Sequence, residues 1–576
     1  MRRRRLLWAL GGLAVAGLWT GAAALLLSRA AADVRAGTAA ISRARAGTEL
    51  TDLTTGEPIA DVRQARASFE RAHRRVTSPA LLPIRLVPVI GRQLESVAAL
   101  SGAATDVSDA VLDAMVEGQR LLNPAPASHP ARVQLVRALG ALAGDTDRRL
   151  DKVDLGPDKG LFGKLARSRQ KLVTELSELQ DQLGRGSAGA AAAAEMLTGP
   201  KRYLVFAANN AEMRAGSGMF LSVGELEVDG NGLRLGEMRS VVDVAVPKGA
   251  VPIDGDLAGR WGWLAPNVEW RNLMTSPRFD EAAPLAARMW VAAGNRPVDG
   301  VLALDPVALQ GLLEATGSVA VDGRTISAGN VVDELLHGQY LRFSGKERAD
   351  RREQLGRIAR AAFEALDGGR WTVEGLAKGL AAAVNGRHLM VWSASPVQQA
   401  GWHALEVDGA LEPGSLLVSV VNRGGNKLDQ FLDVGADLSF APSGPDTEVT
   451  VRLTLHNGTP AGEPPYVAGD DPASGVPPGA YLGIVTVNVP GHAGSPRIDG
   501  VDRLAVAGPD GPTRVVGVQV RVDRGQTSTV TVRFTLPGDR GTIRVEPSAR
   551  VPGIAWTGPG GSWTDGSAHE VAFLAG

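Results

Sequence analysis

The chain has 576 residues, enough for three or four domains, and carries 61 basic against 62 acidic residues. This balance excludes a global electrostatic attraction to nucleic acid, so no nucleic-acid partner is expected. The chain has no cysteine, which excludes disulfides, thiol nucleophiles and cysteine-based metal sites. With 44% hydrophobic and 21% charged residues, the composition is that of a folded globular protein.

The N-terminus joins four consecutive arginines to an uncharged run from Leu6 to Leu27. A helix of that length crosses the roughly 30 Å hydrocarbon core of a bilayer. The arginines place residues 1–5 in the cytoplasm as a basic tail, because cytoplasmic flanks carry the excess of positive charge. The sequence thus predicts a signal anchor at 6–27, a single-pass topology in the cell membrane and an extracytoplasmic bulk in the cell envelope. A cleaved signal peptide is the alternative, although the run is longer than a typical signal-peptide core.

Residues 30–197 have a helical pattern with interruptions. Leucines recur at near-heptad spacing, for example at Leu165, Leu172 and Leu179, with charged residues between them. Pro79, Pro83 and Pro88 cannot all lie inside one helix, so the pattern breaks there. We expect a helical stalk or small bundle, through which the chain could self-associate.

The pattern changes at Lys201. A compact apolar strand begins there, a hairpin is indicated by the Asp229–Gly232 turn, and a helix is expected over 279–293. A strand over 298–304 leads into Asp305-Pro306, which opens a helix that ends at Gly317. This alternation of strands and helices predicts an α/β domain over residues 200–400, with helices covering its sheet.

After Trp402 the helical pattern ends. Four segments alternate apolar and polar residues with period two and are separated by Gly/Pro turns, at 447–457, 481–490, 513–522 and 528–537. This pattern favours an antiparallel β-sandwich over residues 402–576. The fold class is therefore multidomain, and the change in composition predicts that the sandwich folds separately, with a cleavable linker at 393–413.

Chemistry-bearing motifs are few. The sequence has no nucleophile elbow, P-loop or zinc-protease motif, and Gly216-Ser217-Gly218 is better interpreted as a close-packed turn than as a nucleophile loop. Arginines stand out instead, and clustered guanidinium groups bind phosphate in a bidentate manner. The alternative is a solvated helix whose arginines pair with carboxylates. The polar residues of interest, on the first strand and in the later arginine-rich stretch, are Asn209, Asn210, Glu212, Arg214, Arg342, Arg357 and Arg360.

Three segments resemble the actinobacterial envelope family called domain of unknown function 4012. They are RYLVFAANNAEMRAGSGMF, VDGVLALDPVALQGLLEATGSVAV and VVNRGGNKLDQFL. The resemblance covers about residues 200–438 and implies a membrane anchor and a helical region preceding this block.

The same block is more remotely similar to the LytR-CpsA-Psr phosphotransferases, through Tyr340-Leu341-Arg342 and the stretch from Leu355 to Arg360. That resemblance implies binding of a polyprenyl pyrophosphate with a divalent cation such as Mg²⁺, and transfer of a glycopolymer to peptidoglycan. It further implies that Arg342, Arg357 and Arg360 bind the pyrophosphate and that Arg214 supports them.

The chain departs from that family at carboxylates. Ser217-Gly218-Met219 stands where the family has Ser-Asp-Thr, and Gln354 stands in place of an aspartate. Asp243 and Asp305 remain as candidate cation ligands, and the loss of the other carboxylates weakens such a site. We therefore expect a protein that binds a phosphorylated lipid-linked or wall glycopolymer without catalysis. The alternatives are a divalent-cation-dependent phosphotransferase and a structural or assembly protein.

Overall fold

The computed structural model describes residues 2–46, 57–123, 126, 128–342, 348–369, 371, 373–469 and 475–574; at 2–18, 46, 348–353 and 373–374 it describes the backbone alone. The chain forms two compact units. The first, a helical unit, comprises residues up to 126 and 134–191. The second, an α/β and β-sandwich unit, comprises residues 127–133 and 192–576.

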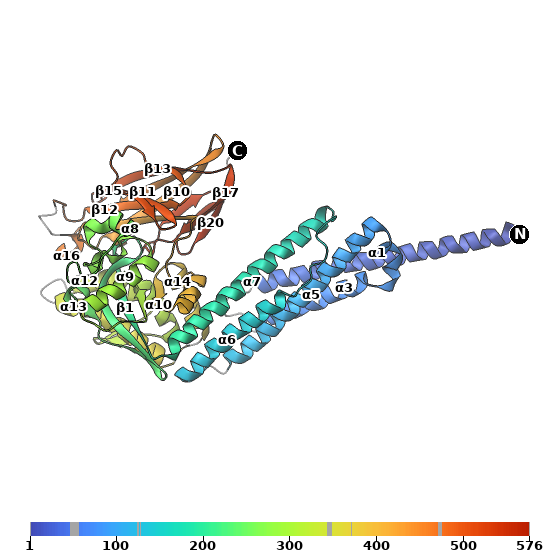
Figure 1. The fold of residues 1–576 in the computed structure, drawn as a ribbon, viewed down its shortest axis with the longest axis horizontal. Helices are drawn as coiled ribbons and strands as arrows, with labels where there is room; N and C mark the ends of the chain where they lie inside the picture. Colours follow the sequence, from blue (N-terminus) through green and yellow to red (C-terminus); the bar gives the residue numbers. More distant parts are fainter. Residues whose placement is uncertain are drawn as a thin grey trace. The chain divides into compact units, whose positions relative to one another are not determined.

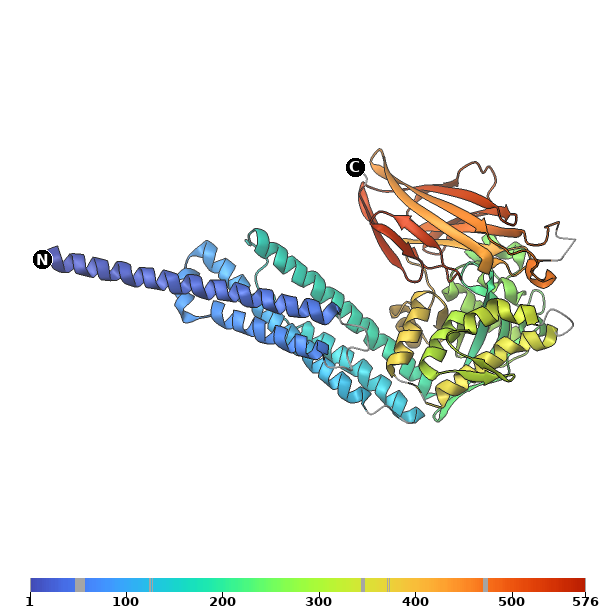
Figure 2. The same cartoon turned by 180° about the vertical axis from the view of Figure 1, so that it is seen from behind.

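The helical unit consists of long helices joined by short connections (Figures 1 and 2). Small side chains on α1 and α3 let these helices pack closely, because Ala40 and Ala65 are fully buried beside Phe69. As the prolines predict, α3 ends before them and α5 starts with Pro88. Proline suits the first position of a helix because the amide proton that it lacks would have no partner there. The helices are α1 (Arg2–Ala46), α3 (Glu57–Val76), η1 (Pro79–Leu81), α4 (Leu82–Arg85), α5 (Pro88–Leu122), α6 (His129–Leu150) and α7 (Gly163–Thr198).

The predicted transmembrane segment, Leu6–Leu27, lies in α1. Among the residues that the structure describes, no helix is long and apolar enough to cross a membrane. In the part of α1 with described side chains, the uncharged stretch ends before Arg29, and Trp19 Nε1 donates a 2.8 Å hydrogen bond to Ala80 O of η1. The predictions of a transmembrane helix, a signal anchor and a single-pass localisation in the cell membrane are therefore wrong, and the extracytoplasmic envelope localisation that followed from them loses its basis. The side chains of residues 6–18 lie outside the described ones.

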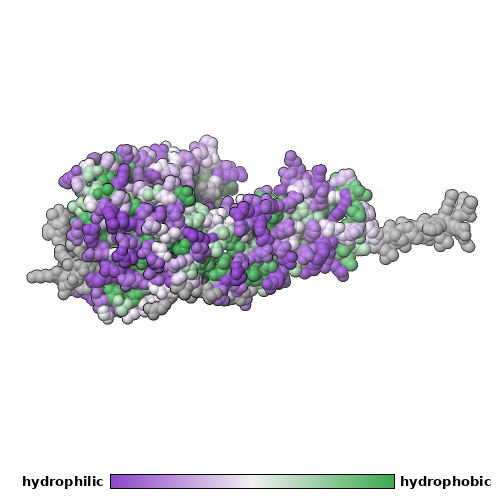
Figure 3. Space-filling view, turned by 60° about the horizontal axis from the view of Figure 1, so that its bottom comes forward, coloured by the Kyte–Doolittle hydropathy of each residue, from purple (hydrophilic) through white to green (hydrophobic). Residues whose placement is uncertain are grey.

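Apolar patches lie among the hydrophilic residues on the face of the helical unit drawn in Figure 3. Exposed aliphatic side chains gather where α4 leads into α5, because the prolines there break the helices before an apolar face can be buried. They are Leu82, Leu86, Val87, Val89 and Ile90.

The α/β part of the second unit is a mixed sheet in the order β3-β2-β1-β5-β8, with β4 paired to β2. β1 is parallel to β5 and antiparallel to β2. Its alternate side chains enter two cores: Phe206 packs with α9 on one face, and Val205 packs with α10 and α13 on the other. Helices therefore cover both faces of the sheet, as the alternation of strands and helices predicts.

The strands and 3₁₀ turns of this part are β1 (Lys201–Met213), β2 (Gly218–Asp229), β3 (Gly232–Leu235), β4 (Arg239–Ser240), η2 (Val241–Asp243), η3 (Gly262–Leu264), η4 (Trp270–Thr275), β5 (Gly300–Leu304), β6 (Val319–Val321), β7 (Arg324–Ile326) and β8 (Leu389–Ser393). The helices are α8 (Gly255–Trp261), α9 (Phe279–Ala292), α10 (Pro306–Thr316), α11 (Val331–Asp333), the π turn η5 (Glu334–Gly338), α12 (Gln339–Arg342), α13 (Arg348–Asp367), α14 (Val373–Asn385) and α15 (Pro396–Ala404). The β2–β3 hairpin confirms the predicted turn, in which Asp229 Oδ1 accepts the amides of Asn231 and Gly232.

The β-sandwich part has two six-stranded sheets, in the orders β14-β15-β12-β9-β17-β20 and β13-β16-β11-β10-β18-β19. The four segments with period-two alternation are β11, β12, β15 and β16, as predicted, and their apolar side chains form the core between the sheets. The elements are β9 (Ser415–Asn422), η6 (Asp429–Phe431), β10 (Leu432–Ser443), β11 (Asp446–Asn457), α16 (Pro465–Ala468), β12 (Tyr481–Pro490), β13 (Gly494–Ile498), β14 (Val506–Asp510), β15 (Thr513–Val522), β16 (Thr527–Leu536), β17 (Arg540–Glu546), β18 (Ala555–Gly558), β19 (Gly561–Thr564) and β20 (His569–Leu574).

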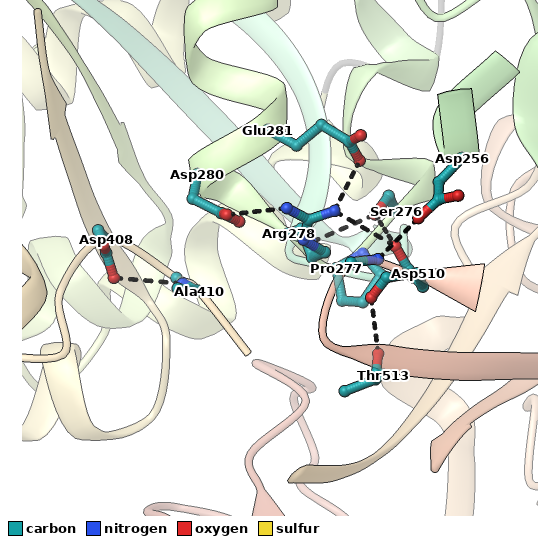
Figure 4. Close-up of polar contacts among 12 residues, drawn as sticks. Asp256, Ser276, Pro277, Arg278, Asp280, Glu281, Asp408, Ala410, Asp510 and Thr513 are labelled. Atoms are coloured by element: carbon teal, nitrogen blue, oxygen red, sulfur yellow. Dashed lines mark hydrogen bonds and ion pairs between the residues drawn. The ribbon is translucent and has the colours of Figure 1, made fainter. Parts of the chain in front are cut away.

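The α/β and sandwich parts share buried residues instead of meeting at a linker. Val421 and Ile484 of the sandwich belong to the cluster around Trp261 and Trp270. A polar network adds to this contact. The buried Asp510, at the end of β14, accepts a 2.8 Å hydrogen bond from Arg260 of α8. Asp510 also lies near Arg278, as Figure 4 shows. The boundary predicted near 402 therefore falls inside one compact unit.

Candidate functional site

A cavity of about 440 Å³ lies where the end of β1 meets the loop after β9. It takes residues from both parts of the second unit. Its charged residues are Arg214, Arg271, Arg423 and Lys427 against Glu212 and Glu269. Its neutral polar residues are Asn209, Ser240, Asn272, Gln339, Tyr340, Asn422 and Tyr466. The lining is polar, and basic groups outnumber acidic ones, which suits an anionic ligand.

Arg214 follows the last residue of β1 and is 5% exposed. Its guanidinium is held by backbone carbonyls: Nε donates to Arg271 O at 2.8 Å, and Nη1 donates to Met213 O and Asn422 O at 3.0 and 3.1 Å. Among the described residues no carboxylate lies within ion-pair distance of it. Burial, and next the charge of Arg423, lower the pKa of Arg214 to about 10. Arg214 is thus a buried cation, oriented by dipoles and lining a cavity.

The turn that carries Arg214 is closely packed. Arg214 N donates to Ser217 O at 2.8 Å, and a side chain at Gly218 would overlap the backbone of Asn209. A side chain at Gly216 would likewise strike Met274. The glycines of the 216–218 segment therefore serve close approach, as the interpretation of a close-packed turn requires.

Lys427 enters the cavity from the loop after β9 and is 4% exposed. Its ammonium forms an ion pair with Glu212 and lies 5.7 and 5.2 Å from the ring centroids of Tyr340 and Tyr466. Burial lowers the pKa of Lys427 to about 7, and the carboxylate of Asp429 opposes this shift. The pair joins the end of β1 to the loop after β9.

The remaining two cations are more exposed. Arg271 binds Glu269 through two contacts, at 2.8 and 2.5 Å, so much of its charge is compensated. Arg423 lies with its guanidinium carbon 5.4 Å from the ring centroid of Trp263, and burial lowers the pKa of Arg423. No carboxylate among the described residues pairs with Arg423. Arg214 and Arg423 line the same cavity, and, besides burial, the charge of Arg423 lowers the pKa of Arg214, so the two cations repel one another. An anion between them would relieve that repulsion.

Asp429 fixes this corner of the structure. It is fully buried and accepts hydrogen bonds from Met213 N, Asn422 Nδ2 and the Tyr481 hydroxyl at 2.8–2.9 Å. Its ion partner is the equally buried Arg550, at 2.9 Å. Because the buried charges are paired and hydrogen-bonded, the end of β1 and the loop after β9 are held in one geometry.

The structure does not gather the four arginines of the sequence hypothesis at this cavity. Of the four, Arg214 lines it. Arg342 forms an ion pair with Glu334, one of whose hydrogen bonds is 2.8 Å long. Arg357 binds Asp322, in the β6–β7 turn, through Nε and Nη2 at 3.0 and 2.8 Å. Arg360 is half-buried on α13, and its Nε has no hydrogen-bond partner among the described residues.

The two candidate cation ligands have different environments. Asp305 is fully buried and uses both oxygens: Oδ1 accepts the amides of Val307 and Ala308 as the N-cap of α10, and Oδ2 accepts from Asn210 and His388. Asp243 is exposed in η2, next to the cavity-lining Val242. In the described parts of the chain, no three His, Asp or Glu side chains form a group that could hold a metal ion. The hydrogen bonds of Asp305 to the N-terminus of α10 and to His388 therefore explain its burial without a metal ion.

Sequence reasoning missed the roles of Arg423, Lys427 and Asp429. All three lie in VVNRGGNKLDQFL, a segment that carries the family resemblance but whose pattern indicates no ligand. The structure brings this segment against the RYLVFAANNAEMR strand. The run of polar residues directly after an apolar run is the signal that the sequence offers; the pairing of the two segments across more than two hundred residues cannot be predicted from either segment alone.

Residues 198–340 match the model of a family described as protein of unknown function (DUF4012). This match supports the resemblance drawn from the sequence over that stretch. No curated protein and no solved structure matches the chain. The matched region contains β1, Arg214 and Tyr340, and it ends before the loop that supplies Arg423 and Lys427.

Proposed function

We propose that the protein binds the phosphate or pyrophosphate group of a larger ligand in the cavity between β1 and the loop after β9. The observation that carries the proposal is the pair Arg214 and Arg423, two cations that line one cavity, repel each other and lack a carboxylate partner among the described residues. Guanidinium groups bind phosphate oxygens in a bidentate manner and form the stronger kind of hydrogen bond.

The finer part of the proposal concerns the ligand that carries the phosphate. The remote resemblance to LytR-CpsA-Psr phosphotransferases, which rests on the sequence alone, suggests a phosphorylated glycopolymer, such as a polyprenyl-pyrophosphate-linked chain. Binding is favoured over transfer, because Asp305, one of the two carboxylates proposed for a cation, uses both oxygens in hydrogen bonds.

Calorimetric titration of the full chain with pyrophosphate tests the proposal. Arg423→Ala should weaken binding about tenfold or more, since hydrogen bonds to charged groups contribute roughly 1.5–3 kcal/mol. Arg521→Ala is the matched control, because Arg521 is an exposed arginine of β15 whose partner is Asp523. It should leave the affinity unchanged.

Arg214→Gln should reduce pyrophosphate binding further than Arg423→Ala, because Arg214 is the buried cation of the pair. Thermal unfolding measured in parallel separates lost binding from lost folding. Pyrophosphate affinity that is equal in wild type, Arg423→Ala and a folded Arg214→Gln would contradict the proposal.

A further inference from the structure

Trp263 is a tryptophan placed outside the core. Trp263 is 59% exposed, whereas Trp261 and Trp270, in the same region, are 1% and 2% exposed. A large aromatic side chain left in solvent loses the free energy that its burial would contribute, so single exposed indoles are frequent at binding surfaces.

The indole is held in place at its polar end. Trp263 Nε1 donates to Arg260 O at 3.1 Å, and Arg260 is itself fixed by its 2.8 Å contact with Asp510. The short η3 turn that carries Trp263 is followed by Ala265, which has a left-handed backbone at φ 48°. The ring therefore has a defined orientation without being buried.

Trp263 contacts Arg423, a residue that lines the cavity. The guanidinium of Arg423 lies 5.4 Å from the indole centroid, and Arg423 also lines the cavity. Such a stack orients the guanidinium and leaves its planar hydrogen-bond donors available. An aromatic surface thus lies beside the proposed phosphate site.

We propose that Trp263 and Arg423 form a platform for a sugar ring, so that the ligand is a phosphorylated saccharide whose pyranose stacks on the indole. The inference rests on the proposed function, because it places the ring next to the bound phosphate. A pyranose presents C–H groups to an aromatic face and hydroxyls at its edge. Asn272 lines the same cavity as Arg423 and donates through Nδ2 to Leu264 O of the η3 turn that carries Trp263, so a polar side chain links this turn to the cavity.

The experiment compares three phosphomonoesters by calorimetric titration of the full chain: glucose 1-phosphate, glycerol 1-phosphate and adenosine monophosphate. Wild type should bind glucose 1-phosphate about tenfold more tightly than glycerol 1-phosphate, since an aromatic contact contributes on that scale. Trp263→Ala should remove this preference; because the indole also orients Arg423, the affinity for glycerol 1-phosphate should fall as well, but less than the affinity for glucose 1-phosphate. Trp263→Phe should restore part of the preference, and equal melting temperatures show that the fold is intact.

The outcomes separate the two proposals. If glycerol 1-phosphate binds but glucose 1-phosphate has no Trp263-dependent advantage, the sugar platform is overturned and the phosphate site stands. If the advantage belongs to adenosine monophosphate alone, the platform takes a nucleobase and the inference is equally overturned. If no phosphomonoester binds to wild type, both proposals fail.

Discussion

At the scale of single residues, buried charges in this protein differ in how they are compensated. Asp429 has a cation, a hydroxyl, an amide side chain and a backbone amide around it, so its charge is satisfied within the fold. The hydrogen-bond partners of the Arg214 guanidinium among the described residues are backbone carbonyls alone. Since an incompletely paired buried charge costs free energy, its retention beside a cavity is best explained by a ligand that supplies the missing anion.

His388 is a second buried residue with a testable charge. Burial lowers the pKa of His388, but the charge of Asp305 and its 2.6 Å hydrogen bond outweigh burial, so the net shift is upward from 6.5. A group with a raised pKa in the folded state contributes stability that is complete below its unfolded pKa and is lost as pH rises through its folded pKa. This part of the free energy of unfolding should therefore fall as pH rises above 6.5.

The measurement is chemical denaturation of wild type and His388→Gln from about pH 5.5 to about pH 9, a range that includes the pH at which a histidine with a raised pKa titrates. The difference between the two proteins isolates His388 from other groups, notably Lys427, whose lowered pKa gives the opposite slope above about 7. The wild type's advantage should shrink as pH rises. A difference that stays constant across the range would show that the pair does not titrate in this way.

At the scale of elements, β1 carries the site. Its first half alternates between two cores, and its last residues are irregularly paired with β2, with register shifts between Ala207 and Ala208 and between Asn209 and Met213. Such a bulge re-aims side chains, here Glu212 and Arg214 toward the cavity. The strand itself was predictable from its apolar run, but the bulge was not, because it depends on Gly218 fitting against the Asn209 backbone.

Gly218→Ala should therefore disturb the site by displacing the irregular end of β1. The new methyl group would overlap the Asn209 backbone, which cannot yield as a flexible side chain would. We expect a loss of stability of about 1–3 kcal/mol, as for other overpacked positions, together with weaker pyrophosphate binding. Gly230→Ala, at the other end of β2 with open space around the position, is the matched control and should change neither. Denaturation and titration of both variants check this, and equal behaviour would contradict the role given to Gly218.

At the scale of the whole molecule, the sequence predicted what depends on local pattern. Period-two alternation located four of the sandwich strands, β11, β12, β15 and β16, and Asp305-Pro306 located the start of α10. The sequence did not predict long-range pairing. A single lysine or aspartate in a loop, such as Lys427 or Asp429, belongs to no periodic pattern. Arg357 and its partner Asp322 are far apart in the sequence and meet in the folded chain. The separate sandwich was inferred from composition, which does not record that Ile484 packs against the α/β core.

That shared core makes a prediction about cooperativity. Ile484, on β12, is 3% exposed and belongs to the cluster formed mainly by the α/β part. Ile484→Ala should cost about 2–5 kcal/mol, as for other large-to-small core substitutions. Because the cluster is common to both parts, hydrogen exchange should accelerate together in peptides from β1 and from β11, although neither strand is altered. If β11 loses protection while β1 keeps it, the sandwich unfolds alone, and the independent domain that composition suggested would be the better description.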